Sequence, residues 1–323
     1  MFVILGGSGF IGTNLRARLA ELHIRSTVVS RSSVVTQSSQ LSHETVITYE
    51  EFDGPIGGKL IKEASIIVYL VSTSVPSTFA DEPWREIDAN VSLAAQTFWR
   101  VARLNPQAKI VFLSSGGTVY GNRPNQLTSE QTPTEPISGY GLGKLLIEEA
   151  LRFTGRATNI SYAILRVSNP IGPHQTNKSQ GIVALAVQAA LNGGTIQLFD
   201  EGRQVRDYID VRDVADSIVK ASITTVRQGT WNIGTGVGHS TAEMLKIVEE
   251  VTQRQVHIEL RPKRPLDVSY IVLDNRLART ELHWTPVRQI HGAVEEIYRS
   301  LVPNIKSDIN TALLGVYYKR DRR

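Results

Sequence analysis

The chain has 323 residues, of which 41% are hydrophobic and 20% charged, and it contains no cysteine. This composition is typical of a folded chain of one or two domains, and it excludes a disordered or fibrous protein, disulfides and thiolate chemistry. Because the formal net charge is only +4 and no run of about 18 apolar residues is present, we expect a cytoplasmic protein with no nucleic-acid and no membrane partner.

From the start of the chain, short apolar runs alternate with amphipathic stretches. The pattern predicts strands at 2–5, 26–30, 66–71, 109–114 and 160–167, and helices at 10–22, 86–104 and 140–153. This order is that of successive βαβ units, and strands that are apolar throughout are typical of a parallel sheet covered on both faces. The predicted fold class is therefore α/β, with a doubly wound parallel (Rossmann) sheet over residues 1–168.

Beyond residue 168 the loops become longer and the predicted elements shorter. We expect helices at 181–192, 211–225, 240–252 and 290–301, and strands at 196–199, 230–233 and 256–260. This mixture predicts a smaller α+β domain over residues 169–323, with some elements returning to the Rossmann sheet.

The first predicted strand runs directly into a glycine-rich loop, GGSGFIG. Gly6, Gly9 and Gly12, with Phe10 and Ile11 between the last two, stand between a strand and a helix. Such a loop brings backbone N–H groups close to a pyrophosphate at a helix N-terminus, so it predicts a dinucleotide site. The alternative interpretation is a plain strand-to-helix turn.

The end of the second strand lacks the acidic residue that usually contacts the ribose of NAD. Ser30, Arg31 and Ser32 stand there instead. A guanidinium and hydroxyls suit a 2′-phosphate, so we prefer NADP, with NAD possible if Arg31 is simply a solvated loop residue.

The stretch SGYGLGK places Tyr140 and Lys144 one helical turn apart, so both point to the same side of the predicted helix. An ammonium near a phenol is expected to lower the phenol's pKa and make an acid/base for alcohols or ketones. This spacing alone also occurs in surface pairs. The glycine loop upstream favours the catalytic interpretation.

Six ordered segments together resemble the extended short-chain dehydrogenase/reductase family, in its branch of nucleotide-sugar epimerases, dehydratases and reductases. They are GGSGFIG, SSGGTVYG (114–121), YGLGK (140–144), LRVSNPIGPHQ (165–175), GRQVRDYIDVRDVADSI (202–218) and KRPLDVSYIVLDNRLARTELHW (263–284). The resemblance covers nearly the whole chain, and it implies a nicotinamide cofactor and a nucleoside diphosphate sugar bound mainly by the C-terminal domain.

The resemblance also implies roles for individual residues. Tyr140 would be the acid/base, and Lys144 would hold the nicotinamide ribose. The cofactor would also contact Ser72, Asn90 and Ser114. The substrate would contact Ser74, Thr118, Asn169, Arg206, Arg264 and Asp267. Alternatively, Asn169 caps a turn, and Asp207 and Asp213 hold loops.

The sequence departs from the family at Gly116, where a serine or threonine usually binds the reacting oxygen. Ser115, or else Thr118, is expected to replace it. The acidic pair that dehydratases of this branch use is missing, so we do not expect 4,6-dehydration. No metal site is predicted.

Two reactions fit these residues. We expect an NADPH-dependent 4-keto-sugar reductase, because Arg31 favours an exchangeable NADPH; the alternative is a UDP-hexose 4-epimerase with retained NAD. A non-catalytic NADP(H) sensor is a further alternative, which Tyr140 and Lys144 disfavour. The resemblance also suggests a homodimer formed through the helices near 86–104 and 140–153.

Overall fold

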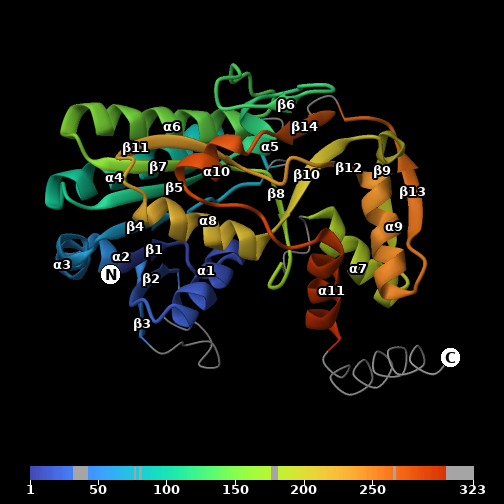
Figure 1. Cartoon of the computed structure of the whole chain (residues 1–323), viewed down its shortest axis with the longest axis horizontal. Helices are drawn as coiled ribbons and strands as arrows, with labels where there is room; N and C mark the ends of the chain where they lie inside the picture. Colours follow the sequence, from blue (N-terminus) through green and yellow to red (C-terminus); the bar gives the residue numbers. More distant parts are fainter. Residues whose placement is uncertain (32–42, 76–77, 80–81, 176–180, 265–266, 303–323) are drawn as a thin grey trace.

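The computed structural model describes residues 1–31, 43–75, 78–79, 82–175, 181–264 and 267–302 (Figure 1). Its largest unit is a parallel sheet of seven strands in the order β3-β2-β1-β4-β5-β7-β11. The strands are β1 (Phe2–Leu5), β2 (Ser26–Ser30), β3 (Glu44–Thr48), β4 (Ile66–Tyr69), β5 (Lys109–Ser115), β7 (Ser161–Val167) and β11 (Gln228–Ile233). The sheet extends outward in both directions from β1 and β4, so the crevice at their carboxyl ends is where this kind of fold binds ligands.

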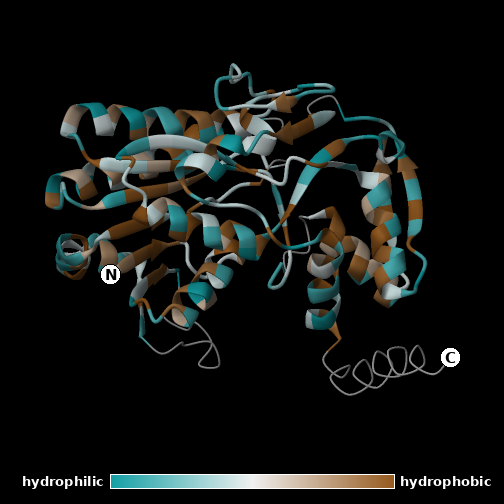
Figure 2. Cartoon of the chain, viewed as in Figure 1, coloured by the Kyte–Doolittle hydropathy of each residue, from teal (hydrophilic) through white to brown (hydrophobic). Residues whose placement is uncertain are grey.

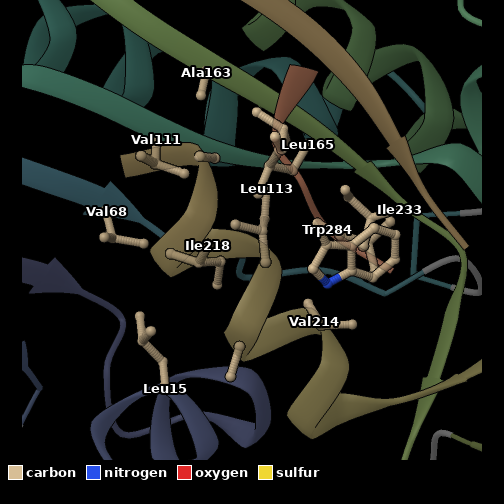
Figure 3. Packing of buried hydrophobic residues seen from close by; sticks show 14 of the residues in the cluster. Leu15, Val68, Val111, Leu113, Ala163, Leu165, Val214, Ile218, Ile233 and Trp284 are labelled. Atoms are coloured by element: carbon tan, nitrogen blue, oxygen red, sulfur yellow. The ribbon is translucent and has the colours of Figure 1, made fainter. Parts of the chain in front are cut away.

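Helices cover both faces of the sheet, which confirms the doubly wound Rossmann prediction. One face carries α1 (Phe10–Glu21) and α8 (Val211–Ile223), and the other carries α4 (Ser92–Leu104) and α6 (Gly139–Thr158) (Figure 1). The strands serve both layers because successive side chains point to opposite faces. Val111 and Leu113 of β5 pack toward α8 (Figure 3), whereas Ile110 and Phe112 pack toward α4 and α6.

Hydrophobic residues lie along the strands of this sheet (Figure 2). Burial of apolar surface contributes roughly 25 cal/mol per Å², so the two layers supply most of the driving force for folding this half. They also hold the carboxyl ends of β1, β4 and β5 in fixed positions.

Three helices of the C-terminal half pack together, and the described residues there also form several short strands. The helices are α7 (Ile182–Asn192), α9 (Thr241–Thr252) and α11 (Ile290–Leu301), which share one apolar cluster. The strands β9 (Thr195–Phe199) and β13 (His257–Arg261) pair in parallel, and a second sheet has the order β12-β10-β14-β6, with β8 paired to β10. Its strands are β6 (Leu127–Thr128), β8 (Asn169–Ile171), β10 (Val205–Asp210), β12 (Gly238–Ser240) and β14 (Tyr270–Leu273).

Two elements from beyond residue 168 pack with the large sheet. β11 forms its edge beside β7, and α8 packs against α1. The remaining elements are α2 (Tyr49–Asp53), α3 (Pro55–Glu63), α5 (Gly116–Val119), α10 (Arg276–Glu281), the π-helical turn η2 (Ile87–Val91) and the 3₁₀ turn η3 (Asp200–Gly202).

The structure differs from the sequence-based elements in four respects, the first being that the short helices α2, α3 and α5 were not predicted. The helix predicted over 86–104 begins with η2, whose wider turn precedes α4. Helix α6 continues five residues beyond the predicted end at 153. The strands β3, β6, β8, β10, β12 and β14 were not predicted, because most are too short or too polar to give a periodic signal. Among the described residues, no helix combines the length and apolar character needed to span a membrane.

Candidate active site

The glycine loop has the geometry that a pyrophosphate requires. Gly6 has φ of +81°, and a β-carbon there would lie 3.0 Å from the carbonyl carbon of Leu70. Gly9 is the N-cap of α1 and supplies no side-chain cap, so the first N–H groups of α1 remain available to an anion. Phe10 and Ile11 open the helix, and Gly12 is buried against Gly7. The residues present therefore fit a dinucleotide.

Of the three residues predicted to contact a 2′-phosphate, Ser30, Arg31 and Ser32, the first two have different surroundings at the end of β2. Ser30 is buried, and its Oγ donates a hydrogen bond to Ser8 Oγ at 3.2 Å, so its hydroxyl is held inside the glycine loop. Arg31 is exposed next to it. Ser32 lies outside the described residues.

Helix α6 presents Tyr140 and Lys144 beside the carboxyl end of β5. The helix starts at an N-cap, Ser138, whose Oγ accepts a hydrogen bond from the N–H of Gly141. Lys144 Nζ donates to the carbonyl oxygen of Leu113 at 3.3 Å and lies 5.5 Å from the centre of the Tyr140 ring. The predicted pair is therefore present, with Lys144 buried and Tyr140 half-buried.

Close packing accounts for the three glycines in SGYGLGK. A β-carbon at Gly139 would meet Pro83, one at Gly141 would meet the carbonyl oxygen of Thr118, and one at Gly143 would collide with the side chain of Glu86. The glycines lower helix propensity but allow α5 and the segment before η2 to approach α6.

The pKa of Tyr140 shifts in the direction opposite to the expectation from the sequence. Burial, followed by the negative charge of Glu86, raises the pKa of Tyr140 above its ordinary value. Burial lowers the pKa of Lys144 to about 8, while Glu86 and Glu148 oppose that change. The expected lowering of the Tyr140 pKa was therefore wrong for this arrangement, because loss of hydration dominates.

Glu86 is the feature of the site that sequence reasoning missed. It is 1% exposed, and its Oε1 accepts hydrogen bonds from Ser74 Oγ and Asn90 Nδ2, both at 2.8 Å. Asn90 Oδ1 in turn accepts from the backbone N–H and the hydroxyl of Thr73, which fixes the loop after β4. The spacing of Glu86 and Asn90, one turn apart in a predicted helix, was the available signal.

Two predicted contact residues have their hydroxyls engaged elsewhere. Ser74 Oγ bonds to Glu86, and Ser114 Oγ donates to Glu148 Oε1 at 2.5 Å. These hydroxyls are held inside the protein rather than offered to a ligand. Ser72 remains exposed, and its Oγ donates to the carbonyl oxygen of Ser74.

A second buried network lies behind Lys144. Glu148 is fully buried and accepts hydrogen bonds from Ser114, Arg152 and Arg166. Arg166 NH1 also donates to Tyr120 Oη at 2.9 Å, and Tyr120 Oη donates to Asn232 Oδ1. Burial alone would lower the pKa of Arg166, but the hydrogen bonds and charge of Glu148 raise it above its ordinary value. This network ties α6 to β5, β7 and β11.

The structure explains the departure at Gly116. A β-carbon there would lie 2.5 Å from Leu273 Cδ1 and 2.9 Å from the carbonyl oxygen of Arg166, so the usual serine does not fit. A β-carbon at Gly117 would lie 3.1 Å from Asn169 Oδ1 and 4.0 Å from Ser115 Oγ, so both oxygens are close to Gly117. Thr118 Oγ1 is turned back toward the carbonyl oxygen of Ser115.

A cavity of about 650 Å³ lies in the C-terminal half. All four residues predicted there to contact substrate line it: Asn169, Arg206, Arg264 and Asp267. The Arg264 guanidinium stacks 3.6 Å from the centre of the Phe199 ring, which also lines the cavity. Its lining does not include Tyr140; Asn169, beside Gly117, is the link between the cavity and α5.

Asp207 and Asp213 serve the loops, as the alternative interpretation held. Asp207 accepts hydrogen bonds from the backbone N–H groups of Thr235, Gly236 and Leu273. Asp213 pairs with Arg288 at 2.6 Å. Neither carboxylate is left for a ligand, and the described residues contain no group of acidic or histidine side chains arranged for a metal.

A Rossmann sheet with a phosphate-binding glycine loop and a tyrosine–lysine pair at the end of β5 defines a nicotinamide-dependent oxidoreductase-type enzyme. The model of the NAD dependent epimerase/dehydratase family matches residues 2–234. The chain therefore belongs to this family, and it is an enzyme.

Two curated relatives cover most of the chain. UDP-glucose 4-epimerase of Mycolicibacterium smegmatis is 30% identical over 295 residues, which is 88% of this chain and 93% of that protein. The dTDP-4-dehydro-6-deoxyglucose reductase of Escherichia coli is 25% identical over 309 residues, or 93% and 96% of the two chains.

Solved structures show the same fold. UDP-glucose 4-epimerase of Thermotoga maritima with UDP-glucose has a TM-score of 0.82 at 24% identity, covering 93% of this chain and 98% of that one. The Thermus thermophilus enzyme in complex with NAD has a TM-score of 0.82 at 22% identity, with the same coverage.

Proposed function

We propose that the enzyme binds a nucleoside diphosphate sugar and inverts the configuration at its C4, as a UDP-hexose 4-epimerase. The observation that carries the proposal is the Tyr140–Lys144 pair at the end of β5, together with a cavity lined by Arg206, Arg264 and Asn169, the last of which lies beside Gly117 of α5. The 30% identical relative is named a UDP-glucose 4-epimerase, which favours epimerisation over the net reduction expected from the sequence.

The residues of the chain divide the work between binding and proton transfer. Arg206 and Arg264 neutralise the diphosphate and hold the sugar toward α5. Ser115 donates a hydrogen bond to the reacting oxygen, and Tyr140 takes the proton of the 4-hydroxyl and later returns it. Lys144 holds the nicotinamide ribose. When bound, the nicotinamide supplies the acceptor and donor of the hydride at C4.

Reduction of a 4-keto nucleotide sugar is the second candidate, and a specific observation favours it. Glu86 and burial hold the proton on Tyr140, which suits donation to a ketone. The 25% identical relative named as a reductase belongs to this class.

For the second candidate, the reductase, the cofactor preference we propose is NADP, because Arg31 is exposed at the end of β2 and a guanidinium suits a 2′-phosphate; for the epimerase we propose a retained NAD. Fluorescence titration should show that Arg31→Ala weakens NADP binding by about tenfold and leaves NAD binding unchanged. Equal effects on the two cofactors would contradict the preference.

We also propose a homodimer through α4 and α6. Four large apolar side chains on these helices are exposed: Leu93, Trp99, Leu142 and Phe153. Trp99 and Phe153 stack with ring centres 6.1 Å apart, so the two helices share one apolar surface. Light scattering should give a dimer for the wild type and a monomer for Trp99→Glu/Phe153→Glu; a monomeric wild type would contradict the proposal.

The reaction itself is tested by two incubations. Purified protein is mixed with UDP-hexoses without added cofactor, and separately with NADPH and a panel of 4-keto nucleotide sugars. Interconversion of C4 epimers without net change in cofactor absorbance supports epimerisation. Stoichiometric consumption of NADPH in the second incubation alone supports reduction, and no reaction in either overturns the proposal.

A further inference from the structure

A buried carboxylate lies against the catalytic helix without taking part in any ion pair with a described residue closer than 4.0 Å. Glu86 packs on α6 at Gly143, where a β-carbon would lie 3.0 Å from Glu86 Oε1 and would collide with its Cγ. Only glycine at position 143 allows this approach, since the contact involves the stem of the glutamate as well as its tip. Gly143 lies between Tyr140 and Lys144 in sequence.

Only one carboxylate oxygen of Glu86 accepts hydrogen bonds from the described residues. Oε1 accepts from Ser74 and Asn90, and Asn90 Nδ2 also donates to Ser74 Oγ at 3.1 Å, so these three side chains form a closed group. Oε2 is buried and has no hydrogen-bond partner among the described residues. A buried carboxylate oxygen without a donor is costly, and such groups in native proteins are concentrated at functional sites.

The charges around the catalytic pair come from three elements. Glu86 precedes η2, Glu148 follows Lys144 on α6, and Arg166 on β7 neutralises Glu148 together with Arg152. Glu86 is thus the carboxylate near Tyr140 that has no guanidinium within 4.0 Å among the described residues. Its charge acts on both members of the pair, since it raises the pKa of Tyr140 and that of Lys144.

We propose that Glu86 is a positioning residue whose buried charge holds the proton on Tyr140 and the charge on Lys144, and so sets the pH at which Tyr140 changes from proton donor to proton acceptor. As a donor, Tyr140 would break its O–H bond and give the proton to the carbonyl oxygen at C4, where a bound reduced nicotinamide would supply the hydride to the carbon. As an acceptor it takes the proton of the alcohol in the reverse step. The inference rests on the proposed function only in taking Tyr140 as the acid/base.

The first experiment follows the phenolate absorbance of Tyr140 with pH in the protein loaded with reduced cofactor, as the difference between each protein and its own Tyr140→Phe derivative. In the wild type the phenolate should be absent below about pH 10, the ordinary tyrosine value. In Glu86→Gln its appearance should move to lower pH by about one unit or more, because a neighbouring negative charge has been removed.

Two further variants separate charge from structure. Asp88→Asn removes an exposed carboxylate two residues away and should titrate like the wild type. Glu86→Asp keeps the charge and should titrate closer to the wild type than Glu86→Gln does. Overlapping titrations of Glu86→Gln and the wild type, or an equal shift in Asp88→Asn, would overturn the proposal.

The titration needs no substrate, so it tests the role of Glu86 even if no nucleotide sugar reacts. With a reactive substrate, the pH profile of turnover should move in the same direction in Glu86→Gln. If Glu86→Gln fails to fold, the wild type alone decides: a Tyr140 phenolate present below about pH 8 would contradict the role of Glu86.

Discussion

The charged side chains behind the tyrosine–lysine pair are buried and bound to one another, whereas the arginines that line the C-terminal cavity have few partners among the described residues. Arg166 makes three hydrogen bonds to Glu148 and one to Tyr120. Arg206 makes one hydrogen bond with the described residues, to the neighbouring carbonyl oxygen of Val205. Burial lowers the pKa of Arg206, opposed by Tyr208 and Asp267.

The charged side chains of these two regions therefore have different roles, one structural and one in ligand binding. Behind the catalytic pair, the ion pairs satisfy each other and hold α6 on the sheet, so they organise the site before any ligand arrives. In the cavity, the guanidinium groups keep unused donors and are suited to an anionic ligand. Stability should therefore depend on the first set of charges, and affinity on the second.

The largest effect is expected for Arg166→Met. The substitution leaves fully buried Glu148 with Arg152 and Ser114 only, so the free energy of unfolding should fall by about 3 to 5 kcal/mol. Urea denaturation measures the loss. Glu148→Gln/Arg166→Met should regain part of it, and a double variant less stable than Arg166→Met would contradict the pairing.

A pH-dependent effect is expected for Lys144. Burial lowers its pKa from the ordinary value of 10.5, which it has in an unfolded chain, to about 8 in the folded protein, so between these values the unfolded chain binds the additional proton. The free energy of unfolding should therefore rise with pH over this window, by about 3 kcal/mol at most. Denaturation curves should show that the wild type gains stability relative to Lys144→Met as the pH rises through this window, because the variant has no titrating group at this position. A constant difference in stability from pH 8 upward would contradict the prediction.

Gly116→Ser tests the packing next to the reacting oxygen. Restoring the family's usual serine should cost about 1 to 3 kcal/mol, because its β-carbon meets Leu273 and the Arg166 carbonyl. Thermal denaturation should show that adding Leu273→Ala costs less in the Gly116→Ser background than alone. Full stability of Gly116→Ser would show that the glycine is not required by packing.

Arg206→Met is expected to have the smallest effect on the fold. UDP binding, measured by calorimetry, should weaken about tenfold with loss of a charged hydrogen bond, while thermal stability stays within about 0.5 kcal/mol. A large loss of stability with unchanged UDP affinity would remove the distinction between the two sets of charges.

The sequence predicted the parts of the molecule whose signals are local. Continuous apolar runs indicated the central strands, and the spacing of Tyr140 and Lys144 indicated one helix face. Glu86 could not be assigned in this way, because its contact with Gly143 joins segments 57 positions apart that no periodicity connects. The glycine at 116 likewise became intelligible only once Leu273 was placed beside it.

Burial was the other quantity that the sequence did not supply. The proximity of Lys144 predicted a more acidic phenol, but the packing of α6 against the segment before η2 removes water from both groups and adds Glu86. The sign of the pKa change for Tyr140 was therefore decided by tertiary contacts.

The central claim is that Tyr140 exchanges the proton at C4 of a nucleotide sugar. Its most direct test compares wild type and Tyr140→Phe for cofactor affinity and for turnover of the substrate identified in the incubations described above. We expect unchanged cofactor affinity and turnover lowered by at least about 10²-fold. A phenylalanine variant that keeps wild-type turnover would contradict the account.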